Sequence, residues 1–158
     1  MRFTAPAALV LTASLLSGCV DSETTRAGSV PSLPAADTAA AQRLISADET
    51  LQTPSFPVSG VTQVSGTVDG YKSTAYLVPV AKGQTLTVTL DSPSANAYFN
   101  VHDAADSSGT AVFNGNTGGR TARLTAPADT TYVIRPFQPR ATARRNKRFP
   151  YRLDIERS

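Results

Sequence analysis

The sequence contains few of the residues from which enzyme active sites are commonly built. Its 158 residues include one cysteine, one histidine and no tryptophan. The single cysteine, Cys19, excludes an intramolecular disulfide. The single histidine, His102, falls within a predicted strand, where a lone histidine is more often structural than catalytic. Because the nucleophile motif Gly-x-Ser-x-Gly is also absent, we predict that the protein is not an enzyme and uses no cofactor.

The acidic residues form no pattern that would bind a metal ion. The segment "DAADSSG" places Asp103 and Asp106 three residues apart, but it lacks the alternating acidic ligands and the bidentate glutamate of a calcium loop. Its serines and glycine are typical of a turn. The twelve acidic residues are scattered, and no pair stands out as the two carboxylates of a glycosidase. We therefore predict no metal site.

The N-terminus has the organisation of a secretory signal. Arg2 provides a positive charge, and residues 5–16, "APAALVLTASLL", form an apolar run too short to span a bilayer as a helix. The sequence "LSGC" that follows resembles the lipobox of bacterial lipoproteins, in which the cysteine thiol is lipidated. We expect residues 1–18 to be a lipoprotein signal peptide and Cys19 to be the lipidation site. The alternative is an ordinary signal peptide with a chance cysteine.

Lipidation would decide where the protein resides. The acyl chains of a lipoprotein anchor it stably, so we expect membrane attachment through Cys19. Val20 follows the cysteine, as in lipoproteins that pass to the outer membrane. The expected location is therefore the cell envelope, at the outer membrane and facing the periplasm.

A region rich in small and polar residues follows the cysteine. Between residues 19 and 57 alanine, serine, threonine and proline predominate, and few large apolar side chains are available for a core. This composition predicts a flexible tether between the lipid and a folded domain. Part of the region, "AADTAAAQRLISADE", could form a short helix, although an isolated helix of this length is marginal in water.

The remaining residues, 58–158, alternate between apolar and polar side chains, as strands with one buried face do. "TAYLVPV" is followed by a turn at Gly83 and by "TLTVTL", and "YRLDIER" ends the domain with the same alternation. Segments such as "DSPSAN" and "NGNTGG" are typical of turns. About eight short strands fit this pattern, which predicts an all-β fold, a small antiparallel β-sandwich or jelly roll.

The basic residues are concentrated near the C-terminus. Residues 135–158 hold eight basic and two acidic residues, a net charge of +6, whereas the other 134 residues have a net charge of −3. The segment "RATARRNKR" links the last two predicted strands and is longer than an ordinary hairpin loop. Loops on a rigid sandwich commonly carry binding residues. Five cations lie in this loop: Arg140, Arg144, Arg145, Lys147 and Arg148.

Charge alone leaves several interpretations of this loop open. It could be solvated, it could bind an anionic envelope polymer or lipid headgroups, or it could enter an acidic cleft. No nucleic-acid partner is expected, because the loop has no interleaved aromatic residues and the protein is exported. If the loop forms a helical turn, Arg140 and Arg144 point the same way. The planar guanidinium of arginine can then pair with a carboxylate through two hydrogen bonds.

The C-terminal segment "YVIRPFQPRATARRNKRFPYRLDIE", residues 132–156, resembles the periplasmic inhibitors of g-type (goose-type) lysozyme. In that family a strand is followed by Gln-x-Arg-x-x-Ala-Arg-(Arg/Lys)-Asn-Lys and by a final Tyr-x-x-Asp-Ile strand. The segment "GYKSTAYLVPVAKGQTLTV" also matches, so the resemblance extends over residues 66–156. "AYFNVHD" and "AVFNG" fit, less specifically, the related pre-peptidase C-terminal-like β-sandwich.

The resemblance implies a β-sandwich that inserts loops into the acidic substrate cleft of a g-type lysozyme, its protein partner. Arg140 and Arg144 match the two loop arginines implicated in inhibition, and Tyr71 matches a tyrosine that assists them. The other cations of the loop would be supporting charges: Arg145, Lys147 and Arg148.

Two features depart from the family, which includes soluble periplasmic proteins. The lipobox and long tether are additional, and "DSSGTAVFNGNTGG" aligns only loosely. The alternative function is a pre-peptidase C-terminal-like structural or carbohydrate- or peptidoglycan-binding module of the cell envelope.

Overall fold

The computed structural model describes residues 33–57 and 60–158. The expected signal peptide, the lipidation site Cys19 and the first part of the expected tether lie outside the described residues. Within the described ranges, no helix is both long enough and apolar enough to cross a membrane.

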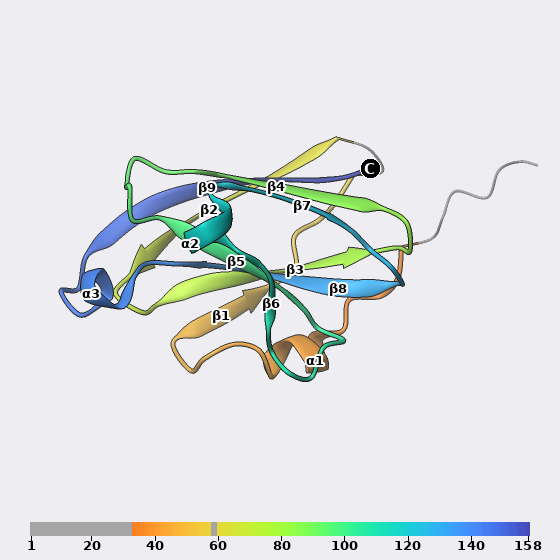
Figure 1. The fold of residues 1–158 in the computed structure, drawn as a ribbon, viewed down its shortest axis with the longest axis horizontal. Coiled ribbons are helices and arrows are strands. Elements are labelled where there is room, and N and C mark those ends of the chain that lie inside the picture. The colour runs from red at the N-terminus through yellow and green to blue at the C-terminus, as the bar shows by residue number, and fades with distance from the viewer. Residues whose placement is uncertain (1–32, 58–59) are drawn as a thin grey trace, which may run out of the picture.

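Two β-sheets pack against each other as a sandwich (Figure 1). The five-stranded sheet has the order β1-β3-β8-β5-β6, and the four-stranded sheet has the order β2-β9-β4-β7. All pairs of neighbouring strands are antiparallel except β1, which runs parallel to β3. The strands are β1 (Glu49–Gln52), β2 (Val61–Asp69), β3 (Ser73–Val80), β4 (Thr85–Asp91), β5 (Tyr98–Asp103), β6 (Ala111–Asn114), β7 (Thr121–Thr125), β8 (Thr130–Phe137) and β9 (Arg148–Arg157). The predicted all-β antiparallel sandwich is therefore confirmed.

The core between the sheets follows from the alternation of apolar residues. On β3, Tyr76 and Val78 face inward, where they join Leu153 and Ile155 of β9 in one buried cluster. Side chains two residues apart on a strand share a face, so each strand contributes alternate residues to this cluster. The intervening residue Leu77 is also buried, on the outer face of the five-stranded sheet. That sheet is therefore covered on both sides over part of its area.

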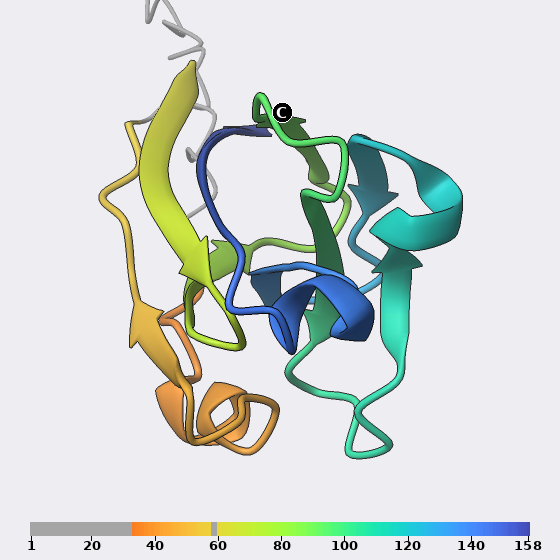
Figure 2. The same ribbon diagram turned by 90° about the vertical axis from the view of Figure 1, so that its left-hand side faces the viewer.

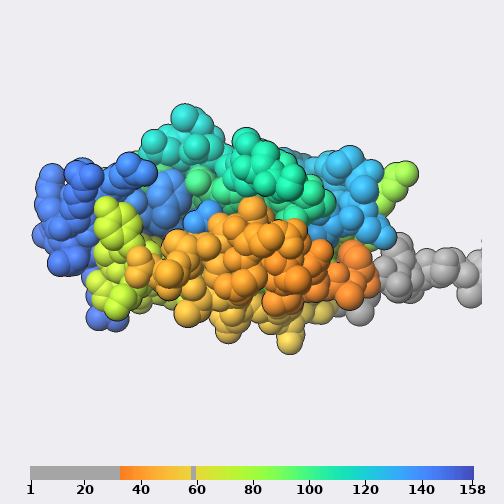
Figure 3. All heavy atoms as spheres, turned by 90° about the horizontal axis from the view of Figure 1, so that it is seen from below, coloured from red at the N-terminus to blue at the C-terminus, as the bar shows by residue number. Residues whose placement is uncertain are grey.

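The outer cover comes from the N-terminal part of the described chain. The short helix α1 (Thr38–Gln42) begins at Asp37, whose carboxylate accepts a hydrogen bond of 2.8 Å from the Ala40 amide. Ala40 and Ala41 are buried, and they pack in a second apolar cluster with the outer face of the sheet. The sheet residues of this cluster are Ala75, Leu77, Ala104 and Val133. Figure 3 shows the N-terminal segment spread over this face of the molecule.

The tether expected over residues 19–57 consequently does not extend to residue 57. Besides α1, the strand β1 adds to the edge of the five-stranded sheet. Phe56 packs against the main core, and the Arg157 guanidinium lies 4.3 Å from its ring centroid. Described residues before 58, where the domain was expected to begin, therefore pack against the sandwich. A tertiary surface stabilises the segment that composition alone marked as unfolded.

The two ends of the sandwich differ. The first described residues lie beside the start of β8, where the Asp37 amide donates a hydrogen bond of 2.9 Å to Thr131 Oγ1. The other end of β8 leads into α3 (Arg140–Ala143), within the basic loop. Figures 1 and 3 show the N-terminal end of the described chain and α3 at opposite ends of the molecule. The expected turn "NGNTGG" also contains a short helix, α2 (Gly115–Gly118).

Candidate functional site

The basic loop forms a helical turn, as the spacing of its arginines allowed. The Arg144 amide donates a hydrogen bond of 2.9 Å to the Arg140 carbonyl, which closes one turn of helix. Ala143 is buried and fixes the turn to the body of the domain. The chain then reverses at Asn146, whose positive φ of 51° is a conformation that asparagine tolerates better than most residues. Arg140 and Arg144 are thus exposed on a rigid turn at the tip of the sandwich, which Figure 2 views end-on.

Tyr71 lies in the tight turn between β2 and β3. Gly70 provides the positive φ of 60° that this turn requires. The side chain of Tyr71 is 51% exposed, which is unusual for a large aromatic residue. The Gly70 amide donates a hydrogen bond of 3.1 Å to the Lys147 carbonyl, so the Tyr71 turn is attached directly to the basic loop.

A buried glutamine fastens these two segments together. Gln138 is 6% exposed, and its Nε2 donates hydrogen bonds to the carbonyl oxygens of Gly70 at 2.9 Å and Lys147 at 2.7 Å. Gln138 therefore acts as a clamp between the Tyr71 turn and the arginine loop. Gln138 is part of the family pattern quoted above, but this role could not be predicted from the sequence, because its two partners are backbone groups far apart in the chain.

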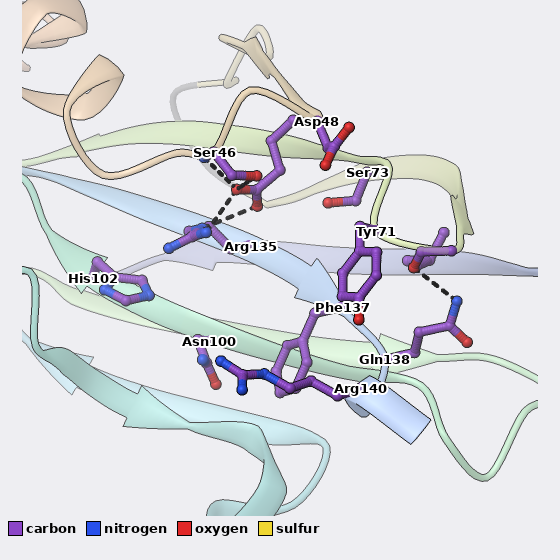
Figure 4. A pocket seen from close by; sticks show the side chains of 13 residues that line it. Ser46, Asp48, Tyr71, Ser73, Asn100, His102, Arg135, Phe137, Gln138 and Arg140 are labelled. Atoms are coloured by element: carbon purple, nitrogen blue, oxygen red, sulfur yellow. Dashed lines mark hydrogen bonds and ion pairs between the residues drawn. The ribbon is translucent and has the colours of Figure 1, made fainter. Parts of the chain in front are cut away.

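Tyr71 and Arg140 both line a cavity of about 380 Å³. Figure 4 shows both side chains beside this cavity, with Arg135, Asn100 and His102 along the sheet beneath. The walls come from residues 46–49, the Tyr71 turn, β5 and β8. Arg144 is not among the lining residues of this cavity. The structure thus brings two of the three predicted binding residues together on one cavity and places the third one helical turn away.

The predicted supporting charges face another part of the surface. Arg145, Lys147 and Arg148 line a separate hollow of about 410 Å³ between the basic loop and residues 93–96. No metal-binding cluster of histidine, cysteine or acidic residues occurs within the described ranges. Of the five cations of the loop, Arg140 therefore lines the Tyr71 cavity, three line the second hollow, and Arg144 lines neither.

A partly buried ion pair forms one wall of the Tyr71 cavity. Arg135 donates to Glu49 through Nε at 3.0 Å and through Nη2 at 2.6 Å, and the Ser46 amide donates to Glu49 Oε2 at 2.8 Å. Burial by itself would raise the Glu49 pKa, but the hydrogen bonds from Arg135 and Ser46 outweigh burial and hold this pKa below its ordinary value. Sequence reasoning missed Glu49 because it falls in the segment that was expected to be a tether.

His102 occupies the floor of the same cavity. It is 6% exposed, and its Nδ1 lies 3.0 Å from the Gly109 carbonyl oxygen. Its Nε2 is buried and has no hydrogen-bond partner among the described residues. Burial and the nearby Arg135 charge lower the His102 pKa, so the imidazole is neutral at pH 7.

The fold and the site together define a class: a small β-sandwich that presents a cationic helical turn and an exposed tyrosine at one end. No protein-family model matches the chain, and no curated protein matches it in sequence. Solved structures, however, are similar to it. PliG of Aeromonas hydrophila, a periplasmic lysozyme inhibitor of g-type lysozyme, is 30% identical, with a TM-score of 0.62 over 70% of this chain and 98% of that one. The chain belongs to the family of PliG, the periplasmic inhibitors of g-type lysozyme.

Two further members of the family share the fold. PliG of Salmonella Typhimurium is 23% identical, with a TM-score of 0.54 over 69% of this chain and 98% of that one. A mutant of the Escherichia coli PliG is 23% identical, with a TM-score of 0.52 over 71% of this chain and all of that one. All three relatives are covered almost completely, so the similarity extends over the whole inhibitor fold rather than over one motif.

Proposed function

We propose that this protein is a lipid-anchored inhibitor of g-type lysozyme in the bacterial envelope, and that Arg140, Arg144 and Tyr71 enter the acidic active-site cleft of the enzyme. One observation carries the proposal: a chain of the PliG family presents these side chains at one rigid tip, where Gln138 fixes the tyrosine turn to the arginine loop. A rigid tip binds without the ordering cost that a flexible loop would incur.

The mechanism of inhibition follows from the chemistry of arginine. A guanidinium beside the catalytic carboxyl group would form a charge-assisted hydrogen bond in a site from which water is excluded. The positive charge would also lower the pKa of that carboxyl group, so that the group could not act as a general acid. The helical turn would occupy the cleft and exclude the glycan. The inhibitor itself would not have to catalyse any reaction.

The direction in which the tip points supports a soluble protein partner. The described chain begins at the end of the sandwich opposite to α3 (Figure 1). A lipid on Cys19 would attach the domain by that far end. The arginine loop would then face away from the point of attachment, which favours a partner in the periplasm over lipid headgroups at the membrane surface.

The inhibitory role can be tested with the lipid-free chain that lacks residues 1–19. We expect this protein to block peptidoglycan hydrolysis by goose-type lysozyme. Replacing both Arg140 and Arg144 by alanine should weaken inhibition about a hundredfold or more, because truncating one side of a buried charge pair costs about 3 kcal/mol. Arg123→Ala is the matched control, since Arg123 is exposed on β7, and it should inhibit like the wild type.

The possible failures are separable. If the double variant inhibits fully, the assigned residues are wrong, while the function remains. If the wild-type protein does not inhibit goose-type lysozyme, the function itself is wrong.

The lipid anchor needs its own experiment, because it depends on the lipobox alone. We expect Cys19→Ser to shift the protein from the membrane fraction to the soluble periplasmic fraction and to abolish labelling by a radioactive fatty acid. The neighbouring Ser17→Ala is the control and should remain in the membrane fraction. Equal labelling of the Cys19→Ser variant would disprove lipidation at this residue.

A further inference from the structure

The outer face of the five-stranded sheet is only partly covered. Near the start of β8, α1 lies over Leu77 and Val133. Toward α3 the same face is open and forms the floor of the Tyr71 cavity. Asn100 on β5 lies opposite Arg135 on β8 in the sheet register, and His102 lies two residues farther along β5, on the same face. The cavity floor is therefore a patch of polar side chains held on rigid strands.

The hydrogen bond at Nδ1 of His102 determines whether the other ring nitrogen, Nε2, is a donor or an acceptor. The Gly109 carbonyl can only accept a hydrogen bond, so Nδ1 carries the proton and donates to it. In the neutral imidazole Nε2 is then an acceptor. This atom is buried and has no donor among the described residues. Buried polar atoms in folded proteins are normally paired, so Nε2 is an unused acceptor, and a donor in the cavity can reach it once the ring moves slightly toward the opening.

Arg135 provides a hydrogen-bond donor on the same cavity floor. Its Nε and Nη2 are engaged by Glu49, whereas Nη1 has no hydrogen-bond partner within the described part of the chain. The carboxylate of Glu49 balances the charge of Arg135, so the floor carries no net charge that would demand an ionic ligand. A carboxylate could accept from Arg135, but it would place a lone pair against His102 Nε2. Inorganic phosphate keeps an O–H at pH 7, but it would add negative charge to a floor whose charges are already balanced. A hydroxyl group can donate to the histidine and accept from the arginine.

Two aromatic side chains stand among the otherwise mixed walls of the cavity, which also include Asp48, Ser73 and Arg140. Phe137 lines the cavity and Tyr71 stands half-exposed at its rim. The volume of about 380 Å³ lies within the range of small-molecule sites, which combine apolar walls with a few convergent polar groups. We propose that this cavity binds a saccharide unit, a neutral ring whose hydroxyl groups meet His102 and Arg135 and whose apolar face lies against the aromatic side chains.

This site goes beyond lysozyme inhibition and does not depend on it. The proposal concerns the free protein, and the ligand is a sugar of the glycan type rather than a second protein. Because Tyr71 and Arg140 form the rim, a bound saccharide and a lysozyme would contact some of the same residues. The competing explanation is that the cavity receives a side chain of the lysozyme and binds no free ligand.

The test is a titration of the lipid-free chain, labelled with ¹⁵N, with N-acetylglucosamine, glucose or inorganic phosphate, followed by NMR. We expect at least one of the two sugars to shift the imidazole nitrogen signals of His102 and the amide signals of the Tyr71 turn, and phosphate to shift neither. His102→Phe keeps a ring of similar shape but lacks the acceptor, and it should weaken sugar binding at least tenfold. The exposed residue Arg123 provides the control variant Arg123→Ala, which should bind like the wild type.

A second variant keeps the test decisive if His102→Phe does not fold. Tyr71→Ala changes an exposed residue, and it should also weaken sugar binding while leaving the melting temperature unchanged. The proposal is overturned if neither sugar shifts the cavity signals, if phosphate alone does, or if the signals move only on addition of lysozyme. None of these outcomes affects the inhibition assay, which is measured separately.

Discussion

At the scale of single residues, Glu49 links the stability of the domain to pH. Its pKa is lower in the folded protein than the ordinary 4.5, since the hydrogen bonds from Arg135 and Ser46 outweigh the effect of burial. A carboxyl group of this kind contributes stability that is fully present above its unfolded pKa and is lost as the pH falls through its folded pKa. We therefore expect the free energy of unfolding to decrease between about pH 5 and pH 3.

The variant Glu49→Gln isolates this contribution. It should be less stable than the wild type at pH 7, because Arg135 loses its buried partner, and its stability should depend less on pH below pH 5. Urea denaturation at a series of pH values measures both effects. Asp48→Asn is the matched control, since Asp48 is an exposed neighbour, and its profile should parallel that of the wild type. An unchanged slope in Glu49→Gln would show that this pair does not set the acid sensitivity.

At the scale of structural elements, the geometry of the tip depends on Gln138. Its amide nitrogen bridges the Tyr71 turn and the arginine loop, and its Oε1 has no partner in the described part of the chain. Gln138→Leu removes both hydrogen bonds and leaves the buried Gly70 carbonyl without a donor, which costs about 1–3 kcal/mol, whereas the Lys147 carbonyl keeps the hydrogen bond from the Gly70 amide. We expect weaker lysozyme inhibition from this variant although Arg140 and Arg144 are intact, and faster hydrogen exchange at the Gly70 amide.

The substitution Gln138→Glu makes the comparison sharper. A carboxylate of nearly the same shape would point oxygen atoms at two carbonyl groups, so this variant should be impaired more than Gln138→Leu. Gln52→Leu, at an exposed position on β1, is the control and should behave like the wild type. If Gln138→Leu retains full inhibition and slow exchange, the direct hydrogen bond from Gly70 to Lys147 is sufficient to hold the tip.

The elements that could be predicted are those that carry their own signal. The strands around Val88 and Leu153 alternate with a period of two, and the basic loop stands between two predicted strands, so the sandwich and its tip could be predicted. The sequence allowed a helical turn at Arg140 without requiring one, and the structure contains this turn. These features are local, which is why a pattern of neighbouring residues is enough to identify them.

The features that could not be predicted depend on distant parts of the chain. α1 is short and rich in alanine, and it exists because Ala40 and Ala41 fit closely over the sheet. The Tyr71 cavity combines residues near positions 48, 71, 102, 135 and 140, and no local pattern brings these together. Binding by Arg140, Arg144 and Tyr71 stays a prediction until the variants are measured.

At the scale of the whole molecule, the N-terminal segment decides where the folded domain begins. α1 and β1 cover one face and one edge of the five-stranded sheet, and Glu49 neutralises Arg135. A chain that starts at residue 33 should therefore be as stable as the lipid-free protein. A chain that starts at residue 58 exposes Leu77 and Val133 and leaves Arg135 without its partner, so it should be several kcal/mol less stable.

Comparing a chain that starts at residue 33 with one that starts at residue 58 tests whether residues 33–57 belong to the domain or to the tether. The measurement is urea denaturation of both chains. The shorter chain keeps the arginine loop and the Gln138 clamp, so any inhibition that it shows while folded would locate binding in the tip alone. If it inhibited equally and unfolded at the same urea concentration as the longer chain, residues 33–57 would be an accessory cover. We expect instead that it loses stability first and inhibition with it, because the open sheet face exposes a large apolar area and an unpaired charge.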